Sequence, residues 1–161
     1  MNTDSTNTRW YDGFFYNLMV DPIAGKSFAR PVSHYVSDDS TAIDIACGVG
    51  TVVETLAKKC SRVTGVDLSP KMASFARKKL KSGSIKNAEI LCGSATELSL
   101  LALDTYDYAI MTQFLHEIPC DIRDHAMEEV KKFAREFIIA DFIAPYPHTF
   151  QGRMIRLIEM S

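Results

Sequence analysis

The cysteines and histidines of this 161-residue sequence lack the spacing that metal sites require. No Cys-x-x-Cys pair occurs among the 4 cysteines, and no two of the 4 histidines stand four residues apart on one helix face. Cysteines scattered in this way are typical of reduced thiols. We therefore expect no metal site and, because no signal peptide is recognisable, a cytoplasmic location.

Long apolar runs and a strong excess of one charge are also missing. No apolar run approaches the roughly 18 residues needed to cross a bilayer, so no membrane span is expected. A net charge of -2 gives no long-range attraction to nucleic acid, and we expect no such partner. With 47% hydrophobic and 24% charged residues, the composition is that of one ordinary globular domain.

The loop that binds nucleoside triphosphates in many enzymes is absent too. Gly25-Lys26-Ser27 has the ending of that motif, but Val20 stands where its first glycine is required. This excludes a P-loop nucleotide triphosphatase.

What the sequence does contain is a regular alternation of apolar strands and amphipathic helices. Near-continuous apolar strands separated by helices predict a doubly wound α/β fold, a mostly parallel sheet covered on both faces. Ligands of such sheets bind at the carboxyl ends of the strands. The expected strands are 42–46, 62–66, 88–92, 106–112 and 136–143, and the expected helices are 26–36, one from 51, 69–80, one through 122–133 and one at 150–160.

A glycine loop joins the first strand to its helix. Gly48 and Gly50 permit close approach of a ligand to the backbone, and the helix opening at Thr51 offers amides to an anionic group. Asp67 follows the second strand, where a carboxylate accepts both hydroxyls of a ribose. Asp67 could instead be a turn residue before the next helix, although Ser69 already supplies an N-cap there.

Two residues around this loop discriminate between cofactors. Val53 occupies the place of the third glycine of the dinucleotide fingerprint, which argues against NAD. Asp44 lies in the strand ahead of the loop, where a carboxylate would repel a pyrophosphate but suits a ligand with an ammonium and a sulfonium. The pattern favours S-adenosylmethionine.

The sequence resembles the class I S-adenosylmethionine-dependent methyltransferases of the small-molecule type, nearest to the quinone-biosynthesis-like and type 11 subgroups. The matching segments are AIDIACGVGTVVETLA, VTGVDLSPKMASFARKK, AEILCGSATEL and YDYAIMTQFLHEIP. The resemblance implies a Rossmann-like sheet of about five strands, S-adenosyl-L-methionine as cofactor and S-adenosyl-L-homocysteine as its product.

The resemblance also implies a set of cofactor contacts around the loops. The methionine portion would contact Asp44, Ala46, Cys47, Gly48 and Gly50, with Thr112 and Gln113 beside its amine; Asp67 would bind the ribose; Leu68, Met72, Gly93, Ser94 and Ala95 would surround the adenine. Ser94 departs from the family, which commonly has an aspartate there to accept from the adenine amino group.

The two ends of the sequence carry less specific expectations. Residues 1–8 are expected to be a disordered tail, 9–36 a helical cap or lid, and 37–161 the cofactor-binding domain. Tyr11 and Tyr16 would help to enclose the cofactor, or would pack in the core. The final antiparallel strand pair of the family is missing, so the chain is either a fragment or has a short sheet. The strand at 136–143 would then lie at an edge that could pair with a second chain to form a homodimer.

The catalytic demands of methyl transfer are modest, because positioning the acceptor in line supplies most of the acceleration. His116 follows the fourth strand and is the candidate base for an acceptor that must lose a proton, the alternative being a structural contact. We expect methylation of a small, lipophilic acceptor. A cofactor-binding module without catalysis and, less favoured, an NAD-dependent oxidoreductase are the alternatives.

Overall fold

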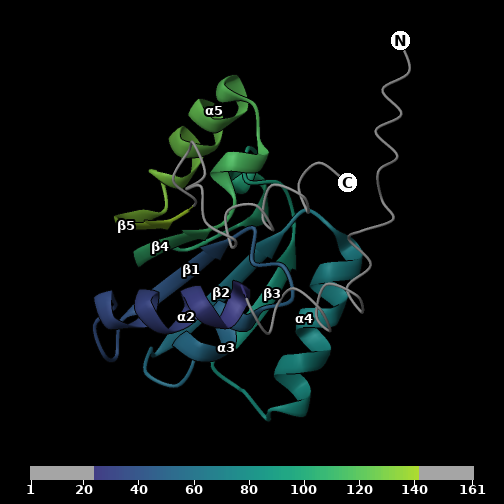
Figure 1. The fold of residues 1–161 in the computed structure, drawn as a ribbon, viewed down its shortest axis with the longest axis vertical. Helices are drawn as coiled ribbons and strands as arrows, with labels where there is room; N and C mark the ends of the chain where they lie inside the picture. The colour runs from purple at the N-terminus through teal and green to yellow at the C-terminus, as the bar shows by residue number, and fades with distance from the viewer. Residues whose placement is uncertain (1–23, 142–161) are drawn as a thin grey trace, which may run out of the picture.

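The computed structural model describes residues 24–141, which form one layered α/β unit (Figure 1). Its elements follow one another as α2 (Ala24–Tyr35), β1 (Thr41–Ile45), α3 (Thr51–Leu56), β2 (Arg62–Asp67), α4 (Pro70–Ser82), β3 (Ala88–Cys92), η2 (Leu98–Leu101), β4 (Tyr106–Thr112), η3 (Leu115–Glu117), α5 (Cys120–Val130) and β5 (Ala134–Ala140). The expected Rossmann-like fold is confirmed. No helix between residues 24 and 141 is long and apolar enough to cross a membrane.

The five strands form a single parallel sheet in the order β3-β2-β1-β4-β5. The chain winds outward from β1 to β3, then returns to place β4 on the other side of β1. This reversal beside β1 is the switch point at which doubly wound sheets bind their ligands. In the described part of the chain β5 lies at an edge of the sheet, as expected, and β3 lies at the other.

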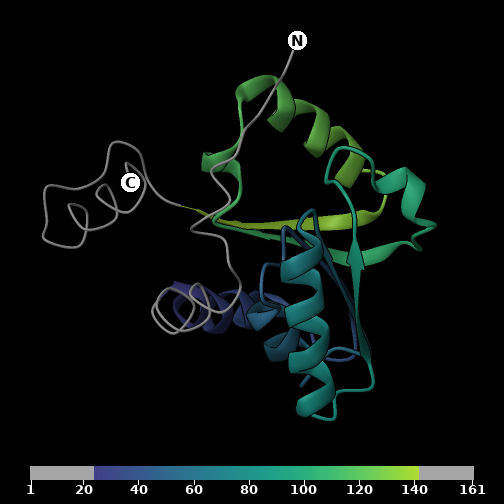
Figure 2. The ribbon, with the colours of Figure 1, turned by 90° about the vertical axis from the view of Figure 1, so that its right-hand side faces the viewer.

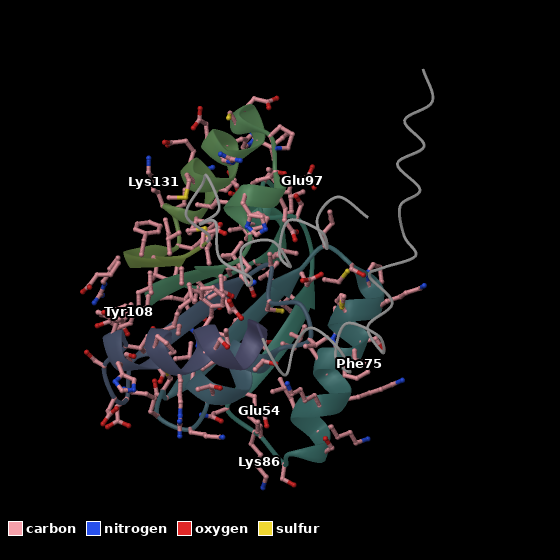
Figure 3. All side chains as sticks on the ribbon, in the orientation of Figure 1. Glu54, Phe75, Lys86, Glu97, Tyr108 and Lys131 are labelled. Atoms are coloured by element: carbon pink, nitrogen blue, oxygen red, sulfur yellow. The ribbon has the colours of Figure 1, made fainter. Side chains whose placement is uncertain are left out.

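Helices cover both faces of the sheet, so each face buries its own apolar cluster. One cluster lies under α2, α3 and α4 and includes Val32, Val53 and Ala76. The second lies under η2 and α5 and includes Leu98 and Val130. Figure 2 shows the two helical layers on opposite sides of the sheet, and Figure 3 shows Glu54 and Phe75 on the first side and Glu97 and Lys131 on the second.

Local sequence signals explain where these elements begin and end. Ser69 caps α4 as expected, because its hydroxyl accepts from the backbone N–H of Met72 at 3.4 Å and Pro70 occupies the first turn. Helix α3 is shorter than its apolar pattern indicates and ends at Leu56. The expected inward face of α5 is only partly correct, since Ile122 is 40% exposed.

Several expectations lie outside the described residues. These are the tail at 1–8, most of the cap at 9–36 with Tyr11 and Tyr16, and the helix at 150–160. The described part of the cap is α2, which packs on α3 and contributes to the first core cluster.

Gly65, in β2, packs closely against the glycine loop and the start of α3. A Cβ at this position would lie 2.7 Å from Cδ1 of Ile90 and 2.9 Å from both Sγ of Cys47 and Cγ2 of Val53. The strand can lie this close to the loop only because residue 65 has no side chain.

We therefore predict that Gly65→Ala lowers the free energy of unfolding by about 1–3 kcal/mol, because three packed side chains would have to move together. Gly83→Ala is the matched control: the nearest atoms to its new Cβ are 3.5 Å away and its φ is -78°. Denaturant titration of both variants measures the difference. Equal stability of the two variants would contradict this account of the close packing.

Candidate functional site

The loop after β1 takes a backbone conformation that few residues adopt. Ala46, Gly48 and Gly50 have φ angles of +57°, +53° and +77°. A Cβ added to Gly48 would have no heavy atom within 4 Å, so this part of the loop faces open space among the described residues. A Cβ on Gly50 would lie 3.0 Å from Cβ of Ala76, which shows that Gly50 faces the protein instead. The loop thus presents bare backbone at Gly48 for a ligand to approach.

Asp67, at the end of β2, holds this loop in place. Its Oδ2 accepts from the backbone N–H of Gly48 at 2.7 Å, and its Oδ1 accepts from that of Ser69 at 2.9 Å. Burial raises the pKa of Asp67, and these two bonds oppose the rise. The turn role that the sequence left open is therefore real. Each carboxylate oxygen has a second lone pair, so the carboxylate can also accept hydroxyls from a ligand.

Asp44 is the most unusual residue of the site. It is 1% exposed, and neither of its carboxylate oxygens has a hydrogen-bond partner among the described residues. Burial first, and the charge of Asp67 second, raise its pKa well above the ordinary value. A buried carboxyl group without partners is costly. Its position beside the loop suits a ligand that supplies a donor or a positive charge.

Cys47 lies in the loop but has no chemical activation. It is 8% exposed, and burial, followed by the charges of Asp44 and Asp67, raises the pKa of its thiol well above the usual range. A thiol held neutral in this way is a poor nucleophile. Its backbone N–H donates to the carbonyl oxygen of Val66 at 3.0 Å. Cys47 therefore joins the loop to β2 and fills space below it.

The loop after β3 lies beside Asp67 as expected. The backbone N–H of Gly93 donates to the carbonyl oxygen of Asp67 at 3.0 Å. The hydroxyl of Ser94 is already engaged, since it accepts from the N–H of Thr96 at 3.2 Å and lies 2.7 Å from the hydroxyl of that residue. Ser94 therefore builds the turn in addition to any contact with a ligand. Ala95 packs on the second core cluster.

The two residues expected to flank the adenine differ in exposure. Leu68 is 72% exposed, whereas Met72 is 4% exposed within α4. An exposed leucine beside a glycine loop is available to cover the face of a planar ligand. Met72 is buried, so it would support the adenine site from beneath the protein surface.

The loop after β4 completes the edge. Thr112 ends the strand, and Gln113 has a φ of +52° while its backbone N–H donates to the carbonyl oxygen of Ala140 at 3.0 Å. His116 follows in η3. Its Nδ1 lies 2.5 Å from Oδ1 of Asp141, and its backbone N–H donates to Oδ2 of the same carboxylate at 3.2 Å.

Asp141 is the site residue that the sequence interpretation missed. It follows β5 directly, just as Asp67 ends β2, and the carboxyl ends of all five strands share one edge. An acidic residue at the end of the last apolar run was the available signal. The expected strand at 136–143 hid it, because the strand ends at Ala140 and a longer strand would place Asp141 inside the sheet.

Two observations indicate that the site at the carboxyl ends of the strands suits a cationic, ribose-bearing cofactor. Within residues 24–141, Gly48 leaves open space where a side chain would stand, and the buried carboxyl of Asp44 has no hydrogen-bond partner. In the part of the chain that the structure describes, no three metal-ligating side chains come together, and the expectation of no metal stays a prediction.

Comparison with known proteins identifies the class to which this architecture belongs. Residues 42–136 match the family described as "Methyltransferase domain", and the chain belongs to that family. The match begins one residue into β1 and ends within β5, so it contains the glycine loop, Asp67 and the loop after β4.

Individual relatives within this family act on different kinds of molecule, to judge by their names. Demethylmenaquinone methyltransferase of Bacillus subtilis (strain 168) is 33% identical over 87 residues, which cover 52% of this chain and 37% of that enzyme. The tRNA (uracil-5-)-methyltransferase homolog A of Homo sapiens is 39% identical over 59 residues, 37% of this chain and 9% of that protein. The chain thus spans well under half the length of these relatives.

A solved structure supports the fold over a larger part of the chain. A SAM-dependent methyltransferase from Aquifex aeolicus superposes with a TM-score of 0.62 and 20% sequence identity, covering 83% of this chain and 77% of that one.

We predict that Asp44→Asn stabilises the ligand-free protein increasingly as pH rises. A carboxyl whose pKa is raised in the folded state favours folding less and less once pH exceeds the unfolded pKa of about 4, because the unfolded chain then ionises more readily. Asparagine does not titrate. Denaturant titrations at pH about 4 and about 7 should therefore show a larger gain at the higher pH.

Asp104→Asn is the control for this experiment. Asp104 is exposed, and its Oδ2 lies 2.6 Å from a guanidinium nitrogen of Arg62. It precedes β4, at the amino ends of the strands and away from the site. A gain for Asp44→Asn that does not change between the two pH values would contradict the burial of an ionisable carboxyl.

Proposed function

We propose that this chain binds S-adenosyl-L-methionine at the carboxyl edge of the sheet and transfers its methyl group to a small-molecule acceptor, leaving S-adenosyl-L-homocysteine. The observation that carries the proposal is the buried carboxyl of Asp44, which has no hydrogen-bond partner in the described part of the chain, in the strand that leads to the open backbone of Gly48. An ammonium or sulfonium ligand would supply the missing partner and would stabilise the ionised carboxylate.

The remaining contacts follow from the positions of the loops. Asp67 would accept the ribose hydroxyls with the lone pairs that Gly48 and Ser69 leave available. Exposed Leu68 would cover the adenine, with Gly93 at its edge. The ligand would supply an electrophilic methyl carbon, while the protein would orient it and keep the acceptor in line.

A small molecule is favoured as acceptor over a macromolecule. Demethylmenaquinone methyltransferase of Bacillus subtilis covers more of this chain than the human tRNA methyltransferase homolog, 52% against 37%. It is also more identical to this chain than the ribosomal protein L11 methyltransferase of Clostridium botulinum, 33% against 27%, although the latter match covers 64% of the chain. The net charge of -2 gives no general attraction to RNA. A cytoplasmic location is part of the same proposal.

Calorimetry with S-adenosylhomocysteine tests the cofactor. We expect binding to the native chain in the micromolar range, or about -8 kcal/mol. Asp44→Asn should weaken it at least about tenfold, because the variant keeps the shape of the site and removes the charge opposite the ammonium. Asp104→Asn, at the far edge of the sheet, should leave the affinity unchanged.

The alternatives predict different outcomes in the same apparatus. Nicotinamide dinucleotide binding that S-adenosylhomocysteine does not displace would favour an oxidoreductase. Tight cofactor binding with no methylated product from a broad panel of small acceptors would favour a binding module without catalysis. Equal affinities for the native chain and Asp44→Asn would remove the main argument for the site.

We also propose that the edge strand β5 pairs with a second copy of the chain. Ile139 is 46% exposed there, and unpaired edges are prone to pairing. Gel filtration over a range of concentrations should show a concentration-dependent dimer, and a monomer throughout would contradict it.

A further inference from the structure

Charge is distributed very unevenly along this chain. Residues 55–88 contain nine of its 18 lysines and arginines but only one of its 20 aspartates and glutamates, Asp67. That carboxylate lies at the candidate site and accepts from two backbone amides. The net charge of -2 is therefore an average over a strongly basic segment and an acidic remainder, and it does not describe the field near α3 and α4.

Two cations of this segment hold the fold together. Nε of Arg77 donates to the carbonyl oxygen of Ile90 at 2.8 Å, which ties α4 to β3. Nζ of Lys79 donates to Oγ1 of Thr51 at 2.7 Å and lies 3.3 Å from Oε2 of Glu54, which ties α4 to α3. These contacts give Arg77 and Lys79 a structural role.

Four other cations of the segment have no such role. They are exposed, and they make no hydrogen bond or ion pair within residues 24–141. They are Lys58, Lys78, Lys81 and Lys86, and we call them the lysine surface. An exposed ammonium without a carboxylate beside it presents its whole charge to whatever approaches from solvent.

Helix α4 supplies the centre of the lysine surface. Lys78 and Lys81 are three residues apart on this helix and are therefore neighbours on its surface. The residues that α4 buries, among them Ala73, Ala76 and Leu80, belong to its opposite side. Figure 3 shows nitrogen-tipped side chains that point from α4 away from the sheet. The helix thus faces the core with apolar residues and solvent with lysines.

A pair of side-chain hydrogen bonds brings the remaining two lysines to one end of α4. Nδ2 of Asn87 donates to the carbonyl oxygens of Ala57 at 2.8 Å and Cys60 at 2.9 Å. Lys58 follows Ala57 and Lys86 precedes Asn87, so these bonds place the two lysines near each other at the amino ends of the strands. Figure 3 shows Lys86 beside the lower end of α4.

The neighbouring acidic side chains face another part of the molecule. Glu89, which is the next acidic residue after this segment, accepts from the hydroxyl of Thr64 at 3.2 Å. Thr64 in turn accepts from Tyr106, which belongs to the core cluster on the other face of the sheet. The exposed carboxylates of α5 also lie beyond the sheet (Figure 2); they are Asp121, Asp124 and Glu128. The sheet therefore separates the lysine surface from these acidic groups.

The lysine surface lacks the features with which proteins usually read nucleic acids. Arginine forks and exposed aromatic rings are the usual contacts to phosphates and bases. Both arginines of the segment are engaged, Arg77 with β3 and Arg62 with Asp104 at 2.6 Å. Phe75 is the segment's one aromatic residue, and it is half-buried. What is left is a group of flexible point charges without a base-reading or stacking group.

A bilayer with anionic headgroups is the partner that such a surface fits. Helix α4 has 13 residues and is therefore about 20 Å long. Lysines along the outer side of a helix lying against the sheet can reach a planar array of phosphates together. Basic clusters of this size are attracted to anionic lipid without any fixed contact geometry.

We propose that the lysine surface docks this chain on membranes that carry anionic phospholipids. The docking goes beyond the proposed function and does not rest on it, because neither the cofactor nor the acceptor takes part. Contact is electrostatic and peripheral, and the acidic remainder of the molecule faces away from the lipid. For a methyltransferase with a lipophilic acceptor, docking would also hold the enzyme beside the phase in which that acceptor dissolves.

Co-sedimentation of the full chain with vesicles tests the docking. We expect binding to phosphatidylcholine vesicles that contain about one third phosphatidylserine and no binding to phosphatidylcholine alone. Binding should be lost at about 1 M salt, where the Debye length is only about 3 Å. Equal binding to the two kinds of vesicle, or no binding to either, would overturn the proposal.

The double variant Lys78→Gln with Lys81→Gln tests the assignment to α4. Each lysine near an anionic bilayer contributes about fivefold, so the vesicle partition coefficient should fall about 25-fold. Lys131→Gln with Arg135→Gln is the matched control, because it removes the same charge from the region of α5 and β5. The control should stay within about twofold of the native chain. Equal losses in the two double variants would show that net charge, and not the lysine surface, governs binding.

Nucleic acid is the competing occupant. A short single-stranded RNA and a DNA duplex are compared with the anionic vesicles at the same concentration of phosphate groups. We expect weaker binding to both nucleic acids than to the vesicles. Stronger binding to either one, lost in Lys78→Gln with Lys81→Gln, would overturn the choice of lipid. All these measurements omit the cofactor, so a failure of S-adenosylhomocysteine binding would count against the proposed function alone.

Discussion

The carboxylate of Asp67 is the interaction on which the candidate site depends. Its side chain accepts from the loop after β1 and from the start of the turn before α4, and its backbone carbonyl accepts from the loop after β3. Three segments that are distant in sequence are joined through one residue. Without it, the amide of Gly48 would lose its partner, and the open backbone beside it would have no fixed conformation.

Asp44 and Asp67 show how two aspartates on neighbouring strands are given different tasks by their surroundings. The carboxylate of Asp67 accepts hydrogen bonds from two backbone amides, so it holds the glycine loop in place before any ligand binds. Asp44 has no such partners among residues 24–141, and ionising its buried carboxyl costs stability. A buried carboxyl without a partner lowers the stability of the ligand-free protein, and a ligand that supplies the partner restores the missing interaction on binding.

Most of the sheet could be predicted from the sequence, because each strand contains a short apolar run and because an aspartate ends β2 and a glycine follows β3. The loop of Gly48 and Gly50 and the turn at Asp67 were predictable for the same reason. The short helices η2 and η3 were not, since turns of three or four residues have no periodicity to detect. The second role of Asp67 depends on the backbone amide of Gly48, which lies 19 residues away, and sequence spacing does not reveal that contact. The bond from the N–H of Thr96 to Ser94 is local, but it forms only in the folded turn. Asp141 was missed because an apolar pattern marks the end of a strand only to within a few residues.

The strand order has a consequence for how the site comes into existence. The two central strands β1 and β4 are joined by contacts such as that between Thr41 and Asp107, 66 residues apart along the chain. Parallel pairing over such separations requires long loops to close first, which makes folding slow compared with that of local structure. During synthesis β1, β2 and β3 leave the ribosome before β4, so the glycine loop is made early but its neighbours Gln113 and His116 come late. Until β4 is synthesised, the edge of β1 that pairs with β4 is exposed. The nascent chain is most prone to aggregation during that interval.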